Sequence, residues 1–310
     1  MSRMNRRSFF IHGSRYAGAL LAATPVRARA ETGRRRLRFG VIAELANEPD
    51  RMLRVYSGLL GELSLKLAPR GIEVAPLIIT RDLSELARLL AQGEVDMVCE
   101  TVFVTLDLQQ ERLVSLTPRL AIVRREQREY HSVFFTNRTT GITALGDLRG
   151  RTLVLQASRS TSAYAVPRAE LARNGIRLFP AGQPKAPPSA AFYVFAGAEL
   201  NQAIWVLKGK GDAGAFNEGD WKRLPEKVRA GLVIFHETQP LLRGLVSFRD
   251  DIDPAIQRAS EEALLDLHHE PPGQRALEQA DGITRFERLT ARDVDRLAQW
   301  RRALRSASGQ

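Results

Sequence analysis

Near the middle of the chain, four hydroxyl-bearing side chains lie close together: Ser158, Ser160, Thr161 and Ser162. They follow an apolar run, 152–155, and precede a helical pattern that ends at Asn174-Gly175. The first N–H groups of a helix are unpaired and carry partial positive charge, so hydroxyls placed there can help to bind the oxygens of a small anion. The alternative is that one serine simply caps the helix. Three consecutive hydroxyls are more than a cap needs, so both interpretations stay open at this point.

The sequence contains few signals for other chemistry. The five histidines include one adjacent pair, and no carboxylate or cysteine stands at metal-ligand spacing from that pair. A nucleophile elbow and a P-loop are missing from the sequence, and no dinucleotide-binding glycine motif follows the first expected strand. Cys99 is the only cysteine, which excludes a disulfide framework, and we expect it to be a buried apolar thiol. The sequence therefore predicts no metal site, no cofactor and no catalytic activity.

Residues 1–30 have the features of a secretory signal peptide. A basic start is followed by a short apolar stretch, 17–26, and by Ala28-Arg29-Ala30, which predicts cleavage before Glu31. The pair Arg6-Arg7 resembles a twin-arginine export signal. The apolar stretch is far shorter than the ~20 residues that span a bilayer. We therefore expect a periplasmic protein, although an uncleaved signal would tether it.

The formal net charge of +11 overstates the basic character of the mature protein. Six of the 46 basic residues lie in the predicted signal peptide, which has no acidic residue, so the rest of the chain carries 40 basic against 35 acidic residues. Part of that excess lies in the run 34–38, which is typical of a solvated edge. We predict no nucleic-acid partner.

The remaining sequence alternates strand and helix patterns in two series. Strands are expected at 37–42, 72–79, 95–100, 131–137, 151–155, 190–196, 212–216, 232–238 and 245–250. Helices are expected at 51–67, 84–91, from Ser162 onward, and at 199–207, 254–267, 272–278 and 291–304. Repeated β-α-β units predict an α/β fold in which helices cover mostly parallel sheets.

Several linked motifs resemble those of phosphate/phosphite/phosphonate-type solute-binding proteins of ABC importers. They are "YHS" at 130–132, "ALGDLRGR" at 144–151, "STSAYAVP" at 160–167 and "GKGDAGAF" at 209–216, in the order in which that family has them. The resemblance implies a two-lobed periplasmic binding protein of type II-like fold, with mixed sheets flanked by helices and a two-strand hinge. We expect lobe one to comprise 31–126 and 236–310, and lobe two to comprise 127–235.

The resemblance also implies which side chains bind the ligand. Ser160, Thr161 and Ser162 would form the oxyanion cradle. From elsewhere in the chain, the resemblance implies contacts by Tyr130 and His131 at the lobe crossing, by Thr101 in a loop after the 95–100 strand, and by Asn217 in a loop after "DAGAF". Hinge packing is the alternative role for Tyr130, because its ring is amphipathic.

Two departures from the family pattern bear on the ligand. Cys99-Glu100-Thr101-Val102 stands where the family has a small Gly/Ser-Pro loop, and Ala163 replaces a glycine. A carboxylate near a dianion repels it. Glu100 therefore either accepts a hydrogen bond from a protonated or amino-bearing ligand, or points away from the site.

The sequence thus predicts a monomeric substrate-binding component that captures a small oxyanion, phosphate- or phosphonate-like, by hinge closure and delivers it to an ABC permease in the inner membrane. One alternative is a periplasmic protein that uses the same fold to present a liganded surface to a membrane sensor. Another is a phosphoester-processing enzyme with Glu100 as base and His131 as acid.

Overall fold

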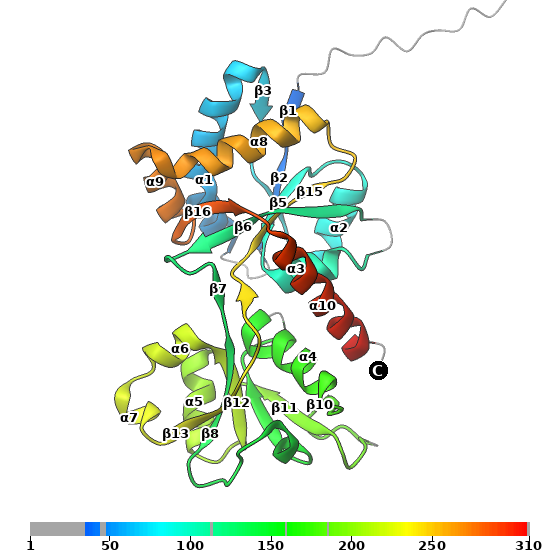
Figure 1. The fold of residues 1–310 in the computed structure, drawn as a ribbon, viewed down its shortest axis with the longest axis vertical. Coiled ribbons are helices and arrows are strands. Elements are labelled where there is room, and N and C mark those ends of the chain that lie inside the picture. Colours follow the sequence, from blue (N-terminus) through cyan, green and yellow to red (C-terminus); the bar gives the residue numbers. More distant parts are fainter. Residues whose placement is uncertain (1–34, 44–47, 112–113, 159, 185, 309–310) are drawn as a thin grey trace, which may run out of the picture. The chain divides into compact units, whose positions relative to one another are not determined.

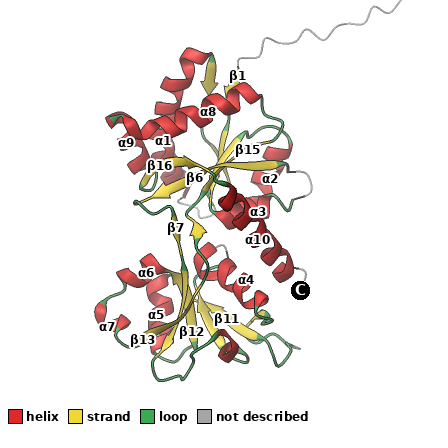
Figure 2. Ribbon diagram, in the orientation of Figure 1, coloured by secondary structure: helices red, strands yellow, loops and turns green. Residues whose placement is uncertain are grey.

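The computed structural model describes residues 35–308 apart from 44–47, 112–113, 159 and 185 (Figure 1). The predicted signal peptide lies outside the described residues. Two six-stranded mixed sheets, each flanked by helices, make up most of the structure (Figure 2). None of the helices in the described part is both long and apolar enough to cross a membrane.

The first sheet has the strand order β16-β6-β15-β5-β2-β4. Its strands are β2 (Phe39–Ile42), β4 (Ile78–Thr80), β5 (Met97–Glu100), β6 (Leu116–Arg124), β15 (Leu245–Arg249) and β16 (Ile283–Arg288). β2 pairs in parallel with both β4 and β5, whereas β6, β15 and β16 pair antiparallel. The carboxyl ends of β2, β4 and β5 therefore lie at one edge of this sheet.

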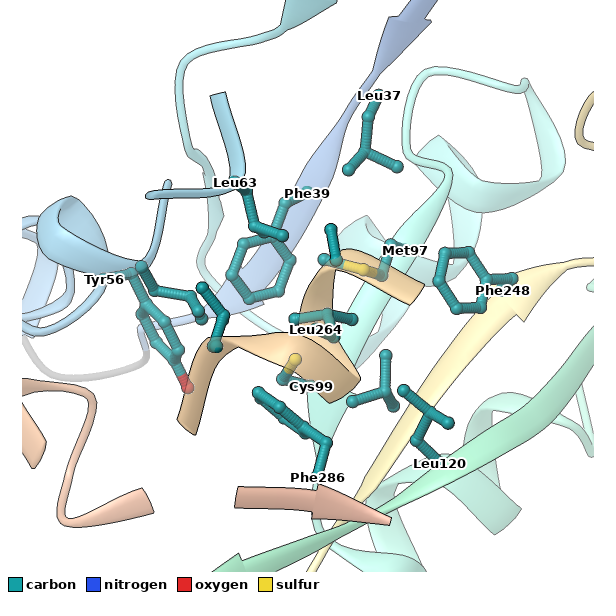
Figure 3. Close-up of a cluster of buried hydrophobic side chains, with 14 of the residues drawn as sticks. Leu37, Phe39, Tyr56, Leu63, Met97, Cys99, Leu120, Phe248, Leu264 and Phe286 are labelled. Atoms are coloured by element: carbon teal, nitrogen blue, oxygen red, sulfur yellow. The ribbon is translucent and has the colours of Figure 1, made fainter. Parts of the chain in front are cut away.

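Helices cover both faces of the first sheet. One face packs against α1 (Glu48–Leu67), α8 (Pro254–Asp266) and α9 (Pro271–Gln279), and the other against α2 (Leu83–Ala91) and α3 (Val102–Leu108). Figure 3 shows the core on the α1 side, where the rings of Phe39 and Tyr56 meet edge to face at 5.1 Å. Cys99 is buried in this cluster, as predicted, and its burial raises the pKa of the thiol.

The second sheet has the order β10-β11-β9-β12-β8-β13. Its strands are β8 (Ser132–Asn137), β9 (Thr152–Leu155), β10 (Leu178–Pro180), β11 (Ala191–Phe195), β12 (Ala213–Asn217) and β13 (Leu232–Glu237). β9, β10, β11 and β12 are parallel, while β8 and β13 are antiparallel to their neighbours. α4 (Val166–Arg173) packs on one face and α5 (Glu199–Leu207) on the other; two short helices, α6 (Glu218–Arg223) and α7 (Glu226–Arg229), follow β12.

The chain passes twice between the two sheets. The first crossing contains β7 (Glu129–Tyr130), the second contains β14 (Leu241–Leu242), and these two short strands pair antiparallel. Two crossing strands of this kind form the hinge that the fold class implies. The exact lobe boundaries stay a prediction.

The C-terminal helix, α10 (Ala291–Ser308), contacts elements on both sides of the crossings. Its Trp300 ring meets Phe103 of α3 at 5.7 Å and lies 6.0 Å from the guanidinium of Arg173 at the end of α4. A buried apolar cluster joins α10 with α3, α4 and β14. The apolar stripe of α10 therefore has partners from both halves of the fold.

Two expected strands are each split. The prediction of one strand at 37–42 is wrong, because β1 (Arg35–Leu37) pairs with β3 (Ile72–Val74) while β2 enters the first sheet. Between them, Arg38 donates its backbone N–H and two guanidinium bonds to the buried Asp96 carboxylate at 2.8–2.9 Å. The expected strand at 72–79 divides into β3 and β4 around Pro76, which has no N–H for a sheet ladder.

Candidate ligand-binding site

The predicted cradle lies at the carboxyl edge of the second sheet. β9 ends at Leu155, and a loop leads to Ser160, which begins a π-helical turn at 161–165 that continues into α4. The proline at 167 explains the wide turn, because it has no N–H to donate to the carbonyl of Ala163. That carbonyl instead accepts from the Gln156 N–H at 3.4 Å. The helical segment therefore begins one residue earlier than the expected Ser162.

The three hydroxyls of the cradle differ in what they contact. Ser160 is the N-cap, and its Oγ accepts from the Ala163 N–H at 3.2 Å. Thr161 is buried, and its hydroxyl lies 2.9 Å from that of Thr101. Ser162 is half-buried, and its carbonyl accepts from the Ser132 hydroxyl at 2.5 Å. The capping interpretation thus holds for Ser160, while Thr161 is turned toward Thr101 at the other sheet.

Thr101 lies after the strand that ends at Glu100, as predicted, but the connection to the next element is this single residue and not a longer loop. It follows β5 directly and is the N-cap of α3, with its Oγ1 accepting from the Val104 N–H at 3.4 Å. The strand-to-helix connection is therefore immediate, and the contact between Thr101 and Thr161 places the N-terminal turn of α3 beside the cradle.

Asn217 also differs from its expected loop position. It is the last residue of β12 and the N-cap of α6, where its Oδ1 accepts from the Asp220 N–H at 3.0 Å. Its amide nitrogen donates to the Asp220 carboxylate. Ser132 pairs with Asn217 across β8 and β12, so Asn217 reaches the cradle through Ser132.

His131 and Tyr130 lie on the first crossing. The Nδ1 atom of His131 is 2.7 Å from the Thr238 carbonyl on the second crossing. Because a carbonyl only accepts, Nδ1 carries the hydrogen, which leaves Nε2 as the acceptor of the neutral ring. Tyr130 is 5% exposed and packs in the cluster below α10, and its burial raises the pKa of the phenol. The packing role of Tyr130 is therefore observed, and ligand contact by either residue stays a prediction.

Glu100 ends β5 and is half-buried. Its backbone carbonyl would lie 3.2 Å from a Cβ placed on Gly244, so the second crossing approaches β5 closely at this glycine. The two alternatives for the direction of the Glu100 carboxylate stay open.

Arg243, which precedes Gly244, was not predicted from the sequence. Its guanidinium lies 4.5 Å from the centroid of the Tyr130 ring, within cation–π range, and donates to the Gln127 side-chain oxygen. Burial is the largest cause that lowers the pKa of Arg243. Tyr130 and the Asp220 carboxylate act in the opposite direction, while the positive charges of Arg124 and Arg223 lower the pKa further. Within the described part of the chain, no carboxylate forms an ion pair with Arg243, and its Nε has no hydrogen-bond partner.

The same guanidinium also approaches the turn at Asn217. A Cβ placed on Gly219 would lie 3.0 Å from Asn217 Oδ1 and 3.7 Å from an Arg243 nitrogen. Arg243 thus lies near Tyr130, Asn217 and the end of β5. The only sequence signal was an arginine-glycine pair between two short apolar runs, "LLRGLV".

Taken together, the structure brings several of the predicted residues into two groups. Thr161 contacts Thr101, while Arg243 contacts the Tyr130 ring and lies near Asn217, which Ser132 joins to the Ser162 turn. Hydroxyls, helix N-termini and one half-buried cation are suited to binding an oxyanion. Among the residues described, no three His, Cys, Asp or Glu side chains gather where they could hold a metal ion.

Comparisons with known proteins agree with this chemistry. Residues 39–294 match a family model described as "ABC transporter, phosphonate, periplasmic substrate-binding protein". XAC2383 from Xanthomonas citri, solved with chloride, is similar at 29% identity and a TM-score of 0.78, over 88% of this chain and 99% of that one. The same protein bound to ATP matches at 28% identity, with a TM-score of 0.78, over 88% of this chain and 98% of that one.

A more distant structure shares the fold. PhnD1 from Prochlorococcus marinus in complex with methylphosphonate is 18% identical, with a TM-score of 0.58, over 88% of this chain and 99% of that one. No curated protein matches this chain.

Proposed function

Because this chain belongs to the family of periplasmic substrate-binding proteins of phosphonate ABC transporters, we propose that it captures a small phosphate- or phosphonate-like oxyanion and delivers it to an ABC permease. The family implies both a small-molecule ligand and a permease partner. The ligand class, the site residues and the closing movement are our proposals.

The observation that carries this proposal is the half-buried guanidinium of Arg243, whose Nε atom is inaccessible to water. A cation removed from water is costly unless an opposite charge or hydrogen bonds compensate it. Within the described residues Arg243 has one amide oxygen and one aromatic ring as partners, and burial lowers its pKa. The Asp220 carboxylate interacts with this charge but forms no ion pair with it, and an anionic ligand beside Arg243 would supply one in direct contact.

The hydroxyl groups give the site direction. Thr101 and Thr161 lie at the N-termini of two helical segments, so the backbone N–H groups of both turns favour a negative charge. We assign Thr101, Thr161, Ser162 and Arg243 to the ligand, together with the predicted Asn217, Tyr130, His131 and Glu100. In our proposal Ser160 acts mainly through the cap.

Closure is the proposed mechanism of capture. Lobe one (31–126 and 236–310) and lobe two (127–235) would rotate about the paired β7 and β14 strands. A ligand favours the closed state only if it contacts both lobes, and Thr101 and Thr161 come from different sheets.

The ligands of similar proteins support an anion in this site. Chloride, ATP and methylphosphonate, the ligands named for the similar structures, are all anionic at neutral pH. The export of the protein by a twin-arginine signal, its periplasmic location, its monomeric state and its lack of catalysis belong to the same proposal.

Calorimetry with the purified protein tests this function. Phosphate, methylphosphonate, methanesulfonate and ATP are titrated separately, and we expect at least one phosphorus oxyanion to bind. Small-angle scattering on the same samples should then show a smaller radius of gyration with that ligand. Absence of binding by every anion would contradict the ligand class, whereas binding without compaction would contradict closure alone.

A further inference from the structure

Three aromatic side chains form a cluster on the α4 face of the second sheet. The Tyr164 ring lies 5.4 Å from the rings of both Tyr193 and Phe195, and those two rings are 4.9 Å apart. The Arg168 guanidinium on α4 lies 5.4 Å from the centroid of Tyr164. We call these four residues the aromatic platform.

The platform begins where the cradle begins. Tyr164 belongs to the same five-residue turn as Thr161 and Ser162. Phe195 ends β11 opposite Leu155, the last residue of β9, and the backbones stay bonded one residue further through the Gly197 N–H and the Gln156 carbonyl at 3.0 Å. The platform therefore lies at the same sheet edge from which the cradle loop departs.

The surface of the platform is only partly covered. Phe195 is 40% exposed, one of five large apolar side chains with such exposure in the described part of the chain. Tyr164 and Tyr193 are half-buried and pack against the core below. An exposed ring supported by two packed rings offers a rigid apolar surface to a partner, at little cost in side-chain order.

The charge on the platform suits an electron-rich or anionic ligand. Arg168 is half-buried, and its Nε has no hydrogen-bond partner among the described residues. Burial raises the pKa of Tyr193 to about 12, and Tyr164 contributes to the same shift. At physiological pH this surface therefore carries the positive charge of Arg168 beside uncharged aromatic rings. Asp107 on α3 lies close enough for its charge to interact with that of Arg168.

We propose that the aromatic platform binds a planar ring of an organic phosphate or phosphonate whose anionic group occupies the adjacent site. The substrate class is then a phosphorus oxyanion that carries an aromatic ring. The inference rests on the proposed function, because the anionic group must lie in the cradle. Stacking on aromatic and guanidinium groups tolerates different rings, since every planar ring has a π face.

Two ligand pairs, whose members differ in having or lacking an aromatic ring, test the platform by calorimetry. One pair is phenylphosphonate and methylphosphonate, and the other is adenosine monophosphate and ribose 5-phosphate, in which the ring lies further from phosphorus. We expect at least one ring-bearing member to bind about five- to hundredfold more tightly than its partner, as one stacked ring provides.

Variants identify where that preference arises. Phe195→Ala should remove most of the preference for the aromatic member of each pair. The affinity for the member without the aromatic ring should stay within about twofold of the wild-type value. Phe195→Trp should retain the preference. The matched control is Leu65→Ala, because Leu65 is an exposed apolar side chain on α1, 70% exposed and outside the second sheet.

The outcomes separate the two proposals. If the ligands without an aromatic ring bind, and the two members of each pair bind with equal affinity, the platform is refuted and the proposed function stands. Loss of the preference in Leu65→Ala as well as in Phe195→Ala would also refute it. If no member of either pair binds, the proposed function fails, and the platform fails with it.

Discussion

Two arginines on the paired crossings have opposite surroundings. Arg128, on the first crossing, donates to both Asp293 oxygens at 3.0 and 2.6 Å and to Glu287 at 2.7 Å. Arg243, on the second crossing, has the Tyr130 ring and the Gln127 side-chain oxygen as its partners. The two are backbone neighbours, since the Arg243 N–H donates to the Arg128 carbonyl at 2.9 Å.

The pKa shifts of the two guanidinium groups reflect this difference. The hydrogen bonds that Arg128 donates to Asp293 raise the pKa of Arg128, while burial lowers that of Arg243. Arg128 is a structural cation that attaches α10 to the hinge. Arg243 is a half-buried cation without a carboxylate ion pair among the described residues, and we propose that a ligand provides one. Position in a β ladder therefore says little about the role of an arginine; the carboxylates around it decide.

The largest effect is expected for Arg128→Gln. Asp293 is 1% exposed, and removing its partner leaves a buried charge with one guanidinium fewer. We expect a loss of about 3–5 kcal/mol in the free energy of unfolding, measured by urea denaturation. Arg70→Gln is the control, because its pair with Glu262 is about half exposed and should contribute less than about 1 kcal/mol. Equal losses in both variants would contradict the structural role.

The second prediction concerns how acid changes the stability that the Arg128–Asp293 pair provides. Burial alone would raise the pKa of Asp293, but hydrogen bonds from Arg128 and Thr290 lower it well below its ordinary value. A carboxyl group whose pKa is lower in the folded state contributes stability above its unfolded pKa and loses it as the pH falls through the folded value. We therefore expect the difference in free energy of unfolding between wild type and Arg128→Gln, measured by urea denaturation, to be the same at pH 5 as at pH 7. At pH 3 this difference should be smaller. A difference in stability that grows as the pH falls would contradict a lowered pKa of Asp293 in the folded state.

The third prediction is a loss of ligand affinity in Arg243→Gln. Losing the charge-assisted contact should weaken binding of the anion found by calorimetry about 30- to 100-fold. Stability to urea should be nearly unchanged, because no carboxylate among the described residues pairs with this cation. Arg243→Lys keeps the charge and should bind with intermediate affinity. Wild-type affinity in Arg243→Gln would remove Arg243 from the site.

The smallest effects distinguish two neighbouring hydroxyls. Thr161→Ala should weaken the binding of the ligand about tenfold, as the loss of one hydrogen bond to a charged group predicts. Ser160→Ala removes the cap bond to Ala163 and should lower stability by about 1 kcal/mol with affinity within about twofold. Calorimetry and thermal unfolding of both variants measure the contrast. The opposite pattern would show that Ser160 binds and Thr161 supports the fold.

Elements with a clear hydrophobic period were predictable, and those with mixed patterns were not. α5 and α2 lie within one residue of their expected bounds. β6 was missed because Pro118 and Arg119 interrupt an otherwise apolar run, although the strand is central and nine residues long. β16, "ITRFER", was missed because the polar residues Thr284 and Arg285 separate its two buried residues.

The candidate site was predictable where a motif specified it and not elsewhere. The hydroxyl cluster and its helix followed from local sequence. The stretch after Thr101 is rich in β-branched residues, and it forms α3 because its apolar face is buried against other elements. Arg243 could not be found from the sequence, since what distinguishes it is the absence of a nearby ion pair in the described fold, which depends on contacts between distant segments.

The packing of α10 has a consequence for how the molecule opens to solvent. Its first turn is attached to the crossing by Arg128, and further along Trp300 and Leu304 lie in the cluster with α3 and α4. Elements held by one shared apolar cluster tend to unfold and refold together. The amide hydrogens of α10, α4 and α3 should therefore exchange with deuterium as one cooperative unit, although the three helices come from widely separated parts of the chain.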